Sequence, residues 1–215
     1  MCYHEPSGVV YGRVPGPRVR GDMRRLIFRL APTLIVAIAL WMAWTTTADA
    51  VTVSQFMDSQ LFKPHKSPIT GAMVVNNSKW YGIDVLAQLV VLAAETSFGD
   101  PKLGGELARQ NNFGCLRYGS APTKWGALAD GKVTVGGKTW YTFPTAQVGM
   151  AAFGRFLKIG QGGVLKKALD QSPYDWAAFG KAYYGQCAGL DDYVARLQRL
   201  EATLRAKAEA FGVSF

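Results

Sequence analysis

Hydrophobic and polar positions set apart one apolar run near the start of the chain. The run LAPTLIVAIALWMAW, residues 30–44, holds 15 residues without a charge, follows a segment rich in arginine and precedes the small residues Ala48 and Ala50. A basic segment, a short apolar stretch and a small-x-small site together predict a secretory signal peptide that is cleaved after Ala50. An uncleaved anchor is the less favoured alternative, because a membrane-spanning helix needs ~20 apolar residues.

The residues before Met23 do not fit a signal peptide, whereas MRRLIFRL, which starts at Met23, is a typical opening for one. We therefore interpret residues 1–22 as the product of an upstream start codon, with a genuine extended leader as the alternative, and residues 23–50 as the signal peptide. Residues 51–215 then form one exported domain, located at the cell wall in the periplasm or outside the cell. We expect no stable membrane anchor after cleavage.

The pattern within residues 51–215 predicts a mainly helical domain interrupted by a small β hairpin. Asp84 caps a helix that runs to Ser97, and its segment VLAQLVVLAA is apolar on nearly all sides, as is typical of a helix buried all round. Two strand-like runs flank Gly136-Gly137 within KVTVGGKTWYTF, which predicts a hairpin. Residues 52–66 are predicted to be a lead-in without regular structure. Other helices are expected over residues 71–80, 103–108, 145–157, 164–171 and 174–184 and from Asp191 onward.

Residues 51–215 carry a positive net charge of +6, from 18 Lys and Arg against 12 Asp and Glu. A basic surface suits an anionic polymer. Because export is predicted, we expect this polymer to be peptidoglycan of the cell wall and not nucleic acid. A basic balance that serves only solubility is the alternative.

The few cysteine and histidine residues limit the kinds of catalytic and metal site that the chain can form. Cys2 is lost with the leader, which leaves Cys115 and Cys187; in an oxidising compartment the two predict one disulfide, while two separate buried thiols are the alternative. Such a bond closes a loop of about 70 residues and contributes ~4 kcal/mol on the chain-entropy model. His65 is the only histidine after residue 50, which argues against a Ser-His-Asp triad and a zinc site. We expect no metal and no cofactor, so the chemistry falls to carboxylates, tyrosines and amides.

Glu95 stands out because it lies at the C-terminal end of the most apolar helix, in LVVLAAETSFGD. No basic residue lies within one helical turn of it in the sequence. Burial there would raise the pKa of its carboxyl, as a general acid near neutral pH requires. A glutamate on the one solvent-facing stripe of a core helix is the alternative, which periodicity by itself favours.

Two further motifs add a resemblance. ETSFG (residues 95–99) and NNFGCLR (residues 111–117) follow a hydrophobic helix, and together they resemble the bacterial peptidoglycan β-N-acetylglucosaminidases, the mannosyl-glycoprotein endo-β-N-acetylglucosaminidase-like family of the lysozyme-like superfamily. The second motif has one residue fewer than the family's NNLFGI. Downstream, WYTFPTAQVGMAAFGRFL and AYYGQCAGLDDYVARLQRL are similar to later passages of the family, with YYGQC in place of YATDP. The resemblance covers residues 67–205.

The resemblance implies a lysozyme-like fold in which Glu95 protonates the glycosidic oxygen of a peptidoglycan β-1,4 bond. Tyr193 and either Tyr183 or Tyr184 match the two tyrosines of the family. The resemblance also implies that Asn111, Asn112, Phe113 and Gly114 shape the floor beside Glu95. The aromatic residues that offer stacking faces for sugar rings are Tyr118, Trp125, Trp140, Tyr141 and Tyr184, with core packing as the alternative for each.

A second carboxylate is harder to find. Glycosidases commonly use a second acid ~5–9 Å from the first. The candidates near Glu95 in the sequence are Asp130 and Glu106. For Asp130, a structural role in the turn before the hairpin is the alternative. The substrate's own N-acetyl group, aided by a tyrosine such as Tyr184, is the other option. A muramidase or lytic transglycosylase of the same fold remains a rival function, as does an inactive wall-binding or assembly module.

Overall fold

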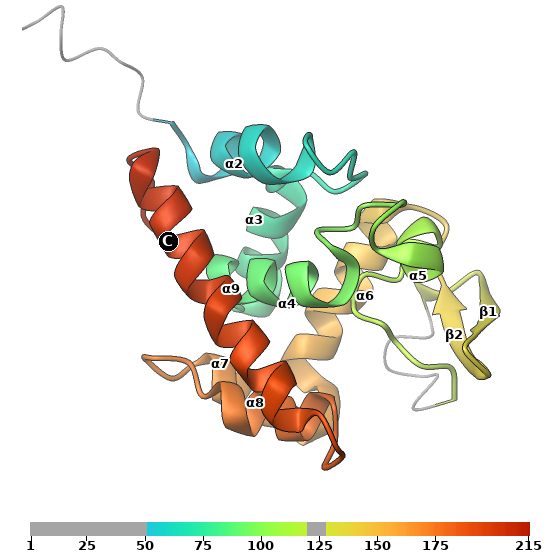
Figure 1. Cartoon of the computed structure of the whole chain (residues 1–215). Coiled ribbons are helices and arrows are strands. Elements are labelled where there is room, and N and C mark those ends of the chain that lie inside the picture. Colours follow the sequence, from blue (N-terminus) through green and yellow to red (C-terminus); the bar gives the residue numbers. More distant parts are fainter. Residues whose placement is uncertain (1–50, 120–127) are drawn as a thin grey trace, which may run out of the picture. The chain divides into compact units, whose positions relative to one another are not determined.

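A computed structural model describes residues 51–119 and 128–215, so the predicted leader over residues 1–50 lies outside the described residues. The described chain is mainly helical with one two-stranded antiparallel sheet (Figure 1). Within it, no helix is long and apolar enough to cross a membrane. In chain order the elements are α2 (Val53–Phe56), η1 (Met57–Phe62), α3 (Gly71–Tyr81), α4 (Val85–Thr96), α5 (Gly105–Arg109), β1 (Gly131–Val135), β2 (Lys138–Thr142), α6 (Ala146–Ile159), η3 (Gly160–Gly163), α7 (Val164–Leu169), α8 (Trp176–Tyr183) and α9 (Leu190–Ala210).

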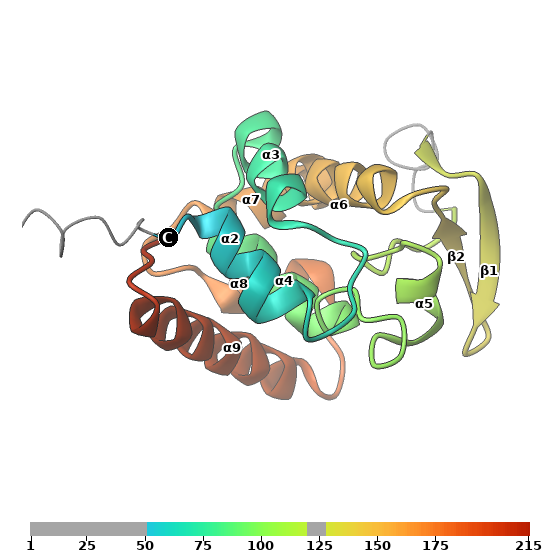
Figure 2. The ribbon, with the colours of Figure 1, turned by 90° about the horizontal axis from the view of Figure 1, so that it is seen from above.

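The helix α4 lies in the centre, with α3 and α9 packed against it (Figures 1 and 2). Asp84 caps α4 as predicted, since its carboxylate accepts hydrogen bonds from the backbone N–H groups of Leu86 and Ala87 at 2.8 and 3.2 Å. Every residue from Leu86 to Ala94 is buried. The prediction of a helix buried all round is therefore confirmed.

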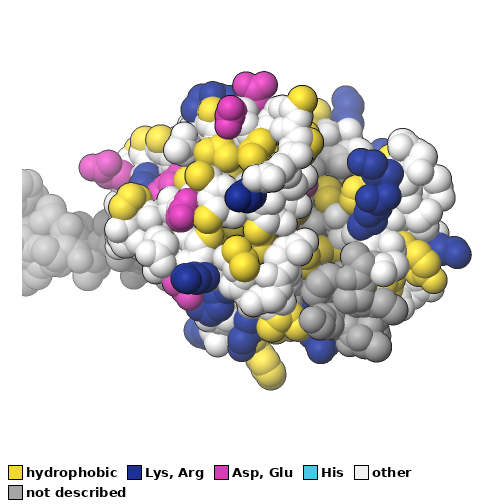
Figure 3. Space-filling model, turned by 90° about the horizontal axis from the view of Figure 1, so that it is seen from below, with side chains coloured by type: hydrophobic (Ala, Val, Ile, Leu, Met, Phe, Trp, Pro, Cys, Tyr) yellow, Lys and Arg dark blue, Asp and Glu magenta, His cyan; other side chains and the backbone are white. Residues whose placement is uncertain are grey.

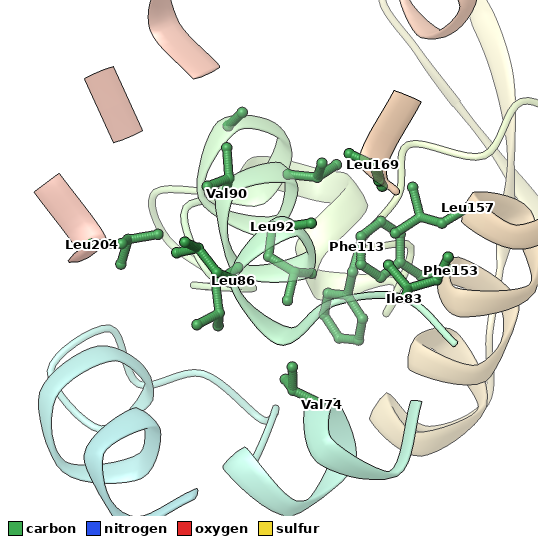
Figure 4. Close-up of a cluster of buried hydrophobic side chains, with 14 of the residues drawn as sticks. Val74, Ile83, Leu86, Val90, Leu92, Phe113, Phe153, Leu157, Leu169 and Leu204 are labelled. Carbon is green, nitrogen blue, oxygen red and sulfur yellow. The ribbon is translucent and has the colours of Figure 1, made fainter. Parts of the chain in front are cut away.

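The hydrophobic core gathers side chains from elements far apart in the sequence (Figure 4). Leu86, Val90 and Leu92 of α4 contribute from the centre, Val74 from α3 and Leu204 from α9. Burial of a large aliphatic or aromatic side chain contributes about 1.5–3 kcal/mol. The packing of α3 and α9 against α4 thus fixes the position of its C-terminal end, where Glu95 lies.

The β hairpin forms as predicted. β1 and β2 pair in antiparallel register from Gly131 opposite Thr142 to Val135 opposite Lys138. Gly136 and Gly137 make the two-residue turn with φ of 58° and 71°, the left-handed conformation that suits the twist of a tight hairpin. The hairpin lies with α5 at one end of the domain (Figure 2).

The segment 52–66, predicted to be an irregular lead-in, is instead largely helical. Thr52 and Gln55 form a capping box in which each side chain binds the other residue's backbone N–H. The following turns, α2 and η1, bury Phe56, Met57 and Phe62 in the core. The prediction failed because the apolar residues of this segment do not follow one regular helical stripe. Its helical turns are stabilised by burial of these side chains in the core.

Surface charge is uneven. On the face shown in Figure 3, Lys and Arg side chains are scattered over the whole face, including the end that carries the hairpin, whereas the acidic side chains lie mainly toward the opposite end. Lys132 and Lys138 of the hairpin are both exposed. Lys124, the third basic residue expected on this lobe, lies outside the described residues.

Candidate functional site

The site begins where α4 ends. Glu95 is the penultimate residue of this helix, and the next three residues after Thr96 all adopt left-handed backbone conformations. Ser97 and Phe98 have φ of 50° and 62°, which is uncommon for residues other than glycine. Phe98 N donates to Leu92 O at 3.0 Å, which closes the last turn. The motif ETSFG therefore ends the helix abruptly, directly after Glu95.

Gly99 completes this turn because no side chain fits there. Its φ is 75°, and a Cβ atom would lie 2.7 Å from Cδ1 of Ile69 and 3.0 Å from the ring of Phe113. Asp100 then accepts hydrogen bonds from the backbone N–H groups of Lys102 and Leu103 at 2.7 and 3.0 Å. Its other oxygen lies 3.5 Å from Nδ1 of His65. The turn after Glu95 is thus held by packing and by a buried carboxylate.

The carboxyl group of Glu95 is hydrogen-bonded to the C-terminal helix. The hydroxyl of Tyr193 on α9 donates to Oε1 of Glu95 at 2.7 Å, and Tyr193 is 8% exposed. Burial raises the pKa of Glu95 above its ordinary value, and this effect outweighs the opposing influences of Tyr193, Cys115, Arg196 and Tyr183. Burial and the neighbouring Glu95 charge also raise the pKa of Tyr193, so its hydroxyl stays a donor.

An aromatic stack backs this hydrogen bond. The rings of Phe179, Tyr183, Tyr193 and Tyr184 follow one another at centroid separations of 5.2, 6.2 and 4.9 Å, with interplanar angles under 20°. Tyr183 donates to the carbonyl oxygen of Gly114 at 2.7 Å. Tyr184 forms the outer end of the stack and is 49% exposed. The tyrosine that binds the Glu95 carboxyl is therefore Tyr193, while Tyr184 presents a ring to solvent.

The NNFG motif is used by the fold itself. Asn112 is fully buried; its Nδ2 donates to the carbonyl oxygens of Leu116 and Tyr141 at 3.0 and 2.9 Å, and its Oδ1 accepts from Leu116 N at 2.7 Å. Asn111 donates to the carbonyl oxygen of Phe143 at 2.9 Å. These bonds tie the loop after α5 to strand β2 and the residue that follows it. Asn112 connects the helical part of the domain to the hairpin.

The resemblance implied that Asn111, Asn112, Phe113 and Gly114 shape the floor beside Glu95, and the side chains of Asn112 and Phe113 are buried and not open to a ligand. Phe113 is fully buried in the core. Gly114 is buried as well, and a Cβ atom there would lie 2.7 Å from the ring of Phe153. Buried groups that already have their partners cannot reach a ligand, so these residues shape the surroundings of Glu95 and do not bind sugar through their side chains.

The predicted stacking residues divide into exposed and buried ones. Tyr118 is 48% exposed, and its ring lies 5.1 Å from that of Tyr141 with Lys132 Nζ 5.0 Å above it. Tyr141 is buried, and its hydroxyl accepts a hydrogen bond from Gly119 N at 3.4 Å, so the prediction of direct stacking is wrong for it. Trp140 is partly buried and donates to Val135 O at 3.2 Å. Trp125 lies outside the described residues.

The two candidates for a second carboxylate are both engaged elsewhere. Asp130 is exposed at the start of the hairpin and accepts a hydrogen bond from the Thr142 hydroxyl at 2.9 Å. Glu106 pairs with Arg109 and accepts from Gln110, each at 2.7 Å, and hydrogen bonds from Gln110 and then Arg109 lower its pKa. Asp130 is thus exposed and the pKa of Glu106 is lowered, whereas burial raises the pKa of Glu95.

The predicted disulfide is wrong, because Cys115 and Cys187 are both free thiols. The thiol of Cys115 points at α4, with Sγ 4.0 Å from the carbonyl oxygen of Glu95, whereas Cys187 is exposed in the loop before α9. Burial, followed by the Glu95 charge, raises the pKa of Cys115 well above its ordinary value. Cys115 therefore lies beside Glu95, the candidate general acid.

Sequence reasoning missed Arg196 and the contact of Cys115 with Glu95. Arg196 lies three residues after Tyr193 on α9, and its positive charge lowers the pKa of Glu95. The spacing of three residues places Tyr193 and Arg196 on the same face of α9. Once Tyr193 is paired with Glu95, this spacing predicts that Arg196 also lies near Glu95. Among residues 51–119 and 128–215, no three His, Cys, Asp or Glu side chains are grouped so as to hold a metal ion.

Comparison of the chain with protein-family models, curated proteins and solved structures finds no match. The geometry around Glu95 offers a partly buried carboxyl group with a raised pKa, a fixed hydrogen-bond donor in Tyr193 and a nearby positive charge in Arg196. It is an arrangement suited to holding a proton at higher pH than an ordinary glutamate and then giving it up.

Proposed function

We propose that this protein is an exported cell-wall glycosidase of lysozyme-like fold that cleaves β-1,4 bonds in peptidoglycan with Glu95 as the general acid. The observation that carries the proposal is the carboxyl group of Glu95, which lies at the end of the buried helix α4 with a raised pKa and a 2.7 Å hydrogen bond from Tyr193. The signal-peptide pattern over residues 23–50 supports the export, and the exposed Lys132 and Lys138 suit an anionic wall.

The hydrogen bond from Tyr193 selects which oxygen delivers the proton. Tyr193 donates to Oε1, so the proton of the neutral carboxyl group resides on Oε2. In the reaction this proton moves to the glycosidic oxygen while the bond from that oxygen to the anomeric carbon breaks. The leaving sugar departs as an alcohol, and Glu95 becomes a carboxylate.

The same neighbours stabilise Glu95 after it has lost its proton. A hydrogen bond to a charged group is worth about 1.5–3 kcal/mol, roughly twice the value for a neutral pair. Tyr193 therefore binds the product carboxylate more strongly than the starting acid, and Arg196 adds a favourable positive charge. Both effects favour proton transfer, while burial raises the pKa of Glu95 and so extends the protonated form to higher pH.

The substrate's N-acetyl group is the best candidate for the second role. Asp130 and Glu106 are committed to Thr142 and to Arg109. In this scheme the acetamido oxygen forms a bond to the anomeric carbon as the leaving group departs. Water then opens the ring so formed, adds its hydroxyl to the anomeric carbon and returns one proton to Glu95.

A site with a single acid is also compatible with a muramidase or a lytic transglycosylase. A lytic transglycosylase needs one glutamate and uses a hydroxyl of the muramic acid in place of water. Mass spectrometry of the fragments released from purified sacculi separates the three reactions. A new reducing end of N-acetylglucosamine supports the proposal, whereas reducing muramic acid or an anhydro-muramic sugar identifies a rival. Release of no fragment, or equal release by the Glu95→Gln variant, would show that the protein is not an enzyme of this kind.

A further inference from the structure

Trp80, at the C-terminal end of α3, is 79% exposed, the highest value for a large apolar side chain among the described residues. One exposed apolar residue needs no special explanation. Trp80, however, borders a cavity of about 300 Å³ at the junction of α3 and α6, which is lined by Met73, Asn76, Trp80, Tyr81, Gln147 and Met150 among others. An indole that is not needed for packing therefore stands beside a space of ligand size.

The walls of this cavity are held in place by close packing of the two helices. Asn77 Nδ2 donates to the carbonyl oxygen of Met150 at 2.6 Å. A Cβ atom at Gly154 of α6 would lie 2.5 Å from the Tyr81 ring, so only glycine lets this ring pack so closely. The cavity is thus preformed, which lowers the entropic cost of binding a ligand there.

The chemistry of the lining indicates a neutral, hydroxyl-rich ligand. Amides, aromatic rings and thioethers line the cavity, and none of the residues around it is charged. Asn76 and Gln147 lie exposed at the rim, and within the described part of the chain neither amide has a hydrogen-bond partner. Each offers donors and an acceptor, which match the hydroxyl and acetamido groups of a sugar, while an indole face matches the apolar C–H face of its ring.

We propose that this cavity is a second glycan-binding site, which takes one N-acetylhexosamine residue with its ring against Trp80 and its polar groups on Asn76 and Gln147. The volume is at the lower end of the ~300–1,000 Å³ typical of small-ligand sites, which suits a single sugar residue. The identity of the polymer rests on the proposed function. The lining includes neither Glu95 nor Tyr193, so the site holds a glycan strand apart from the bond that is cut.

Nuclear magnetic resonance of the ¹⁵N-labelled protein tests this site by binding and not by activity. The probe is chitotetraose, the β-1,4-linked tetramer of N-acetylglucosamine, added to the Glu95→Gln variant so that no cleavage occurs. The indole N–H signal of Trp80 is assigned by its loss in Trp80→Phe, and we expect it to shift with chitotetraose. Affinity measured at this signal falls roughly tenfold in Gln147→Leu. Val164→Ala is the control, because Val164 is an exposed apolar residue on α7 outside the cavity.

Each outcome decides the proposal. An indole signal that stays in place at millimolar chitotetraose, or that shifts equally with an uncharged apolar peptide, overturns it. A shift caused by raising the protein concentration alone would assign the face to a second copy of the chain instead. Loss of this binding with normal fragment release from sacculi would refute only the second site, whereas binding in a protein without activity would refute only the proposed catalysis.

Discussion

Tyr193→Phe is the sharpest test of how the site works. The substitution removes the hydroxyl that donates to Oε1 of Glu95 at 2.7 Å and keeps the buried ring that stacks between Tyr183 and Tyr184. A hydrogen bond to a charged group is worth about 1.5–3 kcal/mol. The carboxylate of Glu95 loses this stabilisation, while the neutral acid loses only the smaller value of a neutral bond, about 0.5–1.5 kcal/mol.

Two kinetic changes follow from this difference. Because the hydroxyl favours the ionised form, its removal raises the pKa of Glu95 further, and the alkaline limb of the pH–rate profile moves to higher pH. Because the carboxylate that forms during proton transfer is less stable by about 1–2 kcal/mol, the maximal kcat falls by roughly 5- to 30-fold. Both quantities are measured from fragment release from sacculi between pH 4 and pH 9, with folding checked by circular dichroism.

Tyr174→Phe is the matched control. Tyr174 also donates to a carboxylate, Asp84 Oδ1, at 2.5 Å, but at the opposite end of α4. It should lower the free energy of unfolding and leave the alkaline limb in place. If Tyr193→Phe moves the limb to lower pH, or leaves both the limb and kcat unchanged, Tyr193 does not act on Glu95 and the argument for a general acid loses its support.

Three further predictions concern the acids and the NNFG loop. Glu95→Gln lowers turnover on sacculi by about 10²–10⁴-fold. Because the pKa of Glu95 is raised in the folded protein, the free energy of unfolding falls as pH rises from the unfolded pKa to the folded pKa, by at most about 1.4 kcal/mol per pH unit. Urea titrations at several pH values should show that this slope is smaller in the variant. Asp130→Asn changes turnover by less than about tenfold if the substrate's N-acetyl group assists; a loss as large as that of Glu95→Gln would make Asp130 the second catalytic acid. Asn112→Ala removes three buried hydrogen bonds and takes from the buried Leu116 N–H its acceptor, which costs about 2–4 kcal/mol in urea unfolding; an unchanged midpoint would contradict the role assigned to this side chain.

Local signals in the sequence were sufficient for the elements around the site. Asp84 and the ETSFG motif mark both ends of α4 because caps and left-handed turns act on neighbouring residues. Gly136-Gly137 likewise specifies the hairpin turn through its own backbone freedom. Glu95 could be singled out for the same reason, since a carboxylate at the end of an apolar helix is visible in the sequence.

The tertiary structure alone decided what surrounds that carboxylate. Tyr193 reaches Glu95 across 98 residues because α9 packs along α4, and no local pattern distinguishes it from Tyr184, which lies exposed at the end of the same stack. Tertiary packing also decided the state of the cysteines. The number of cysteines predicted a disulfide, but packing places Cys115 beside Glu95 and Cys187 in an exposed loop. Capping and turn formation depend on residues a few positions apart, whereas hydrogen-bond partners and burial depend on how the helices pack together.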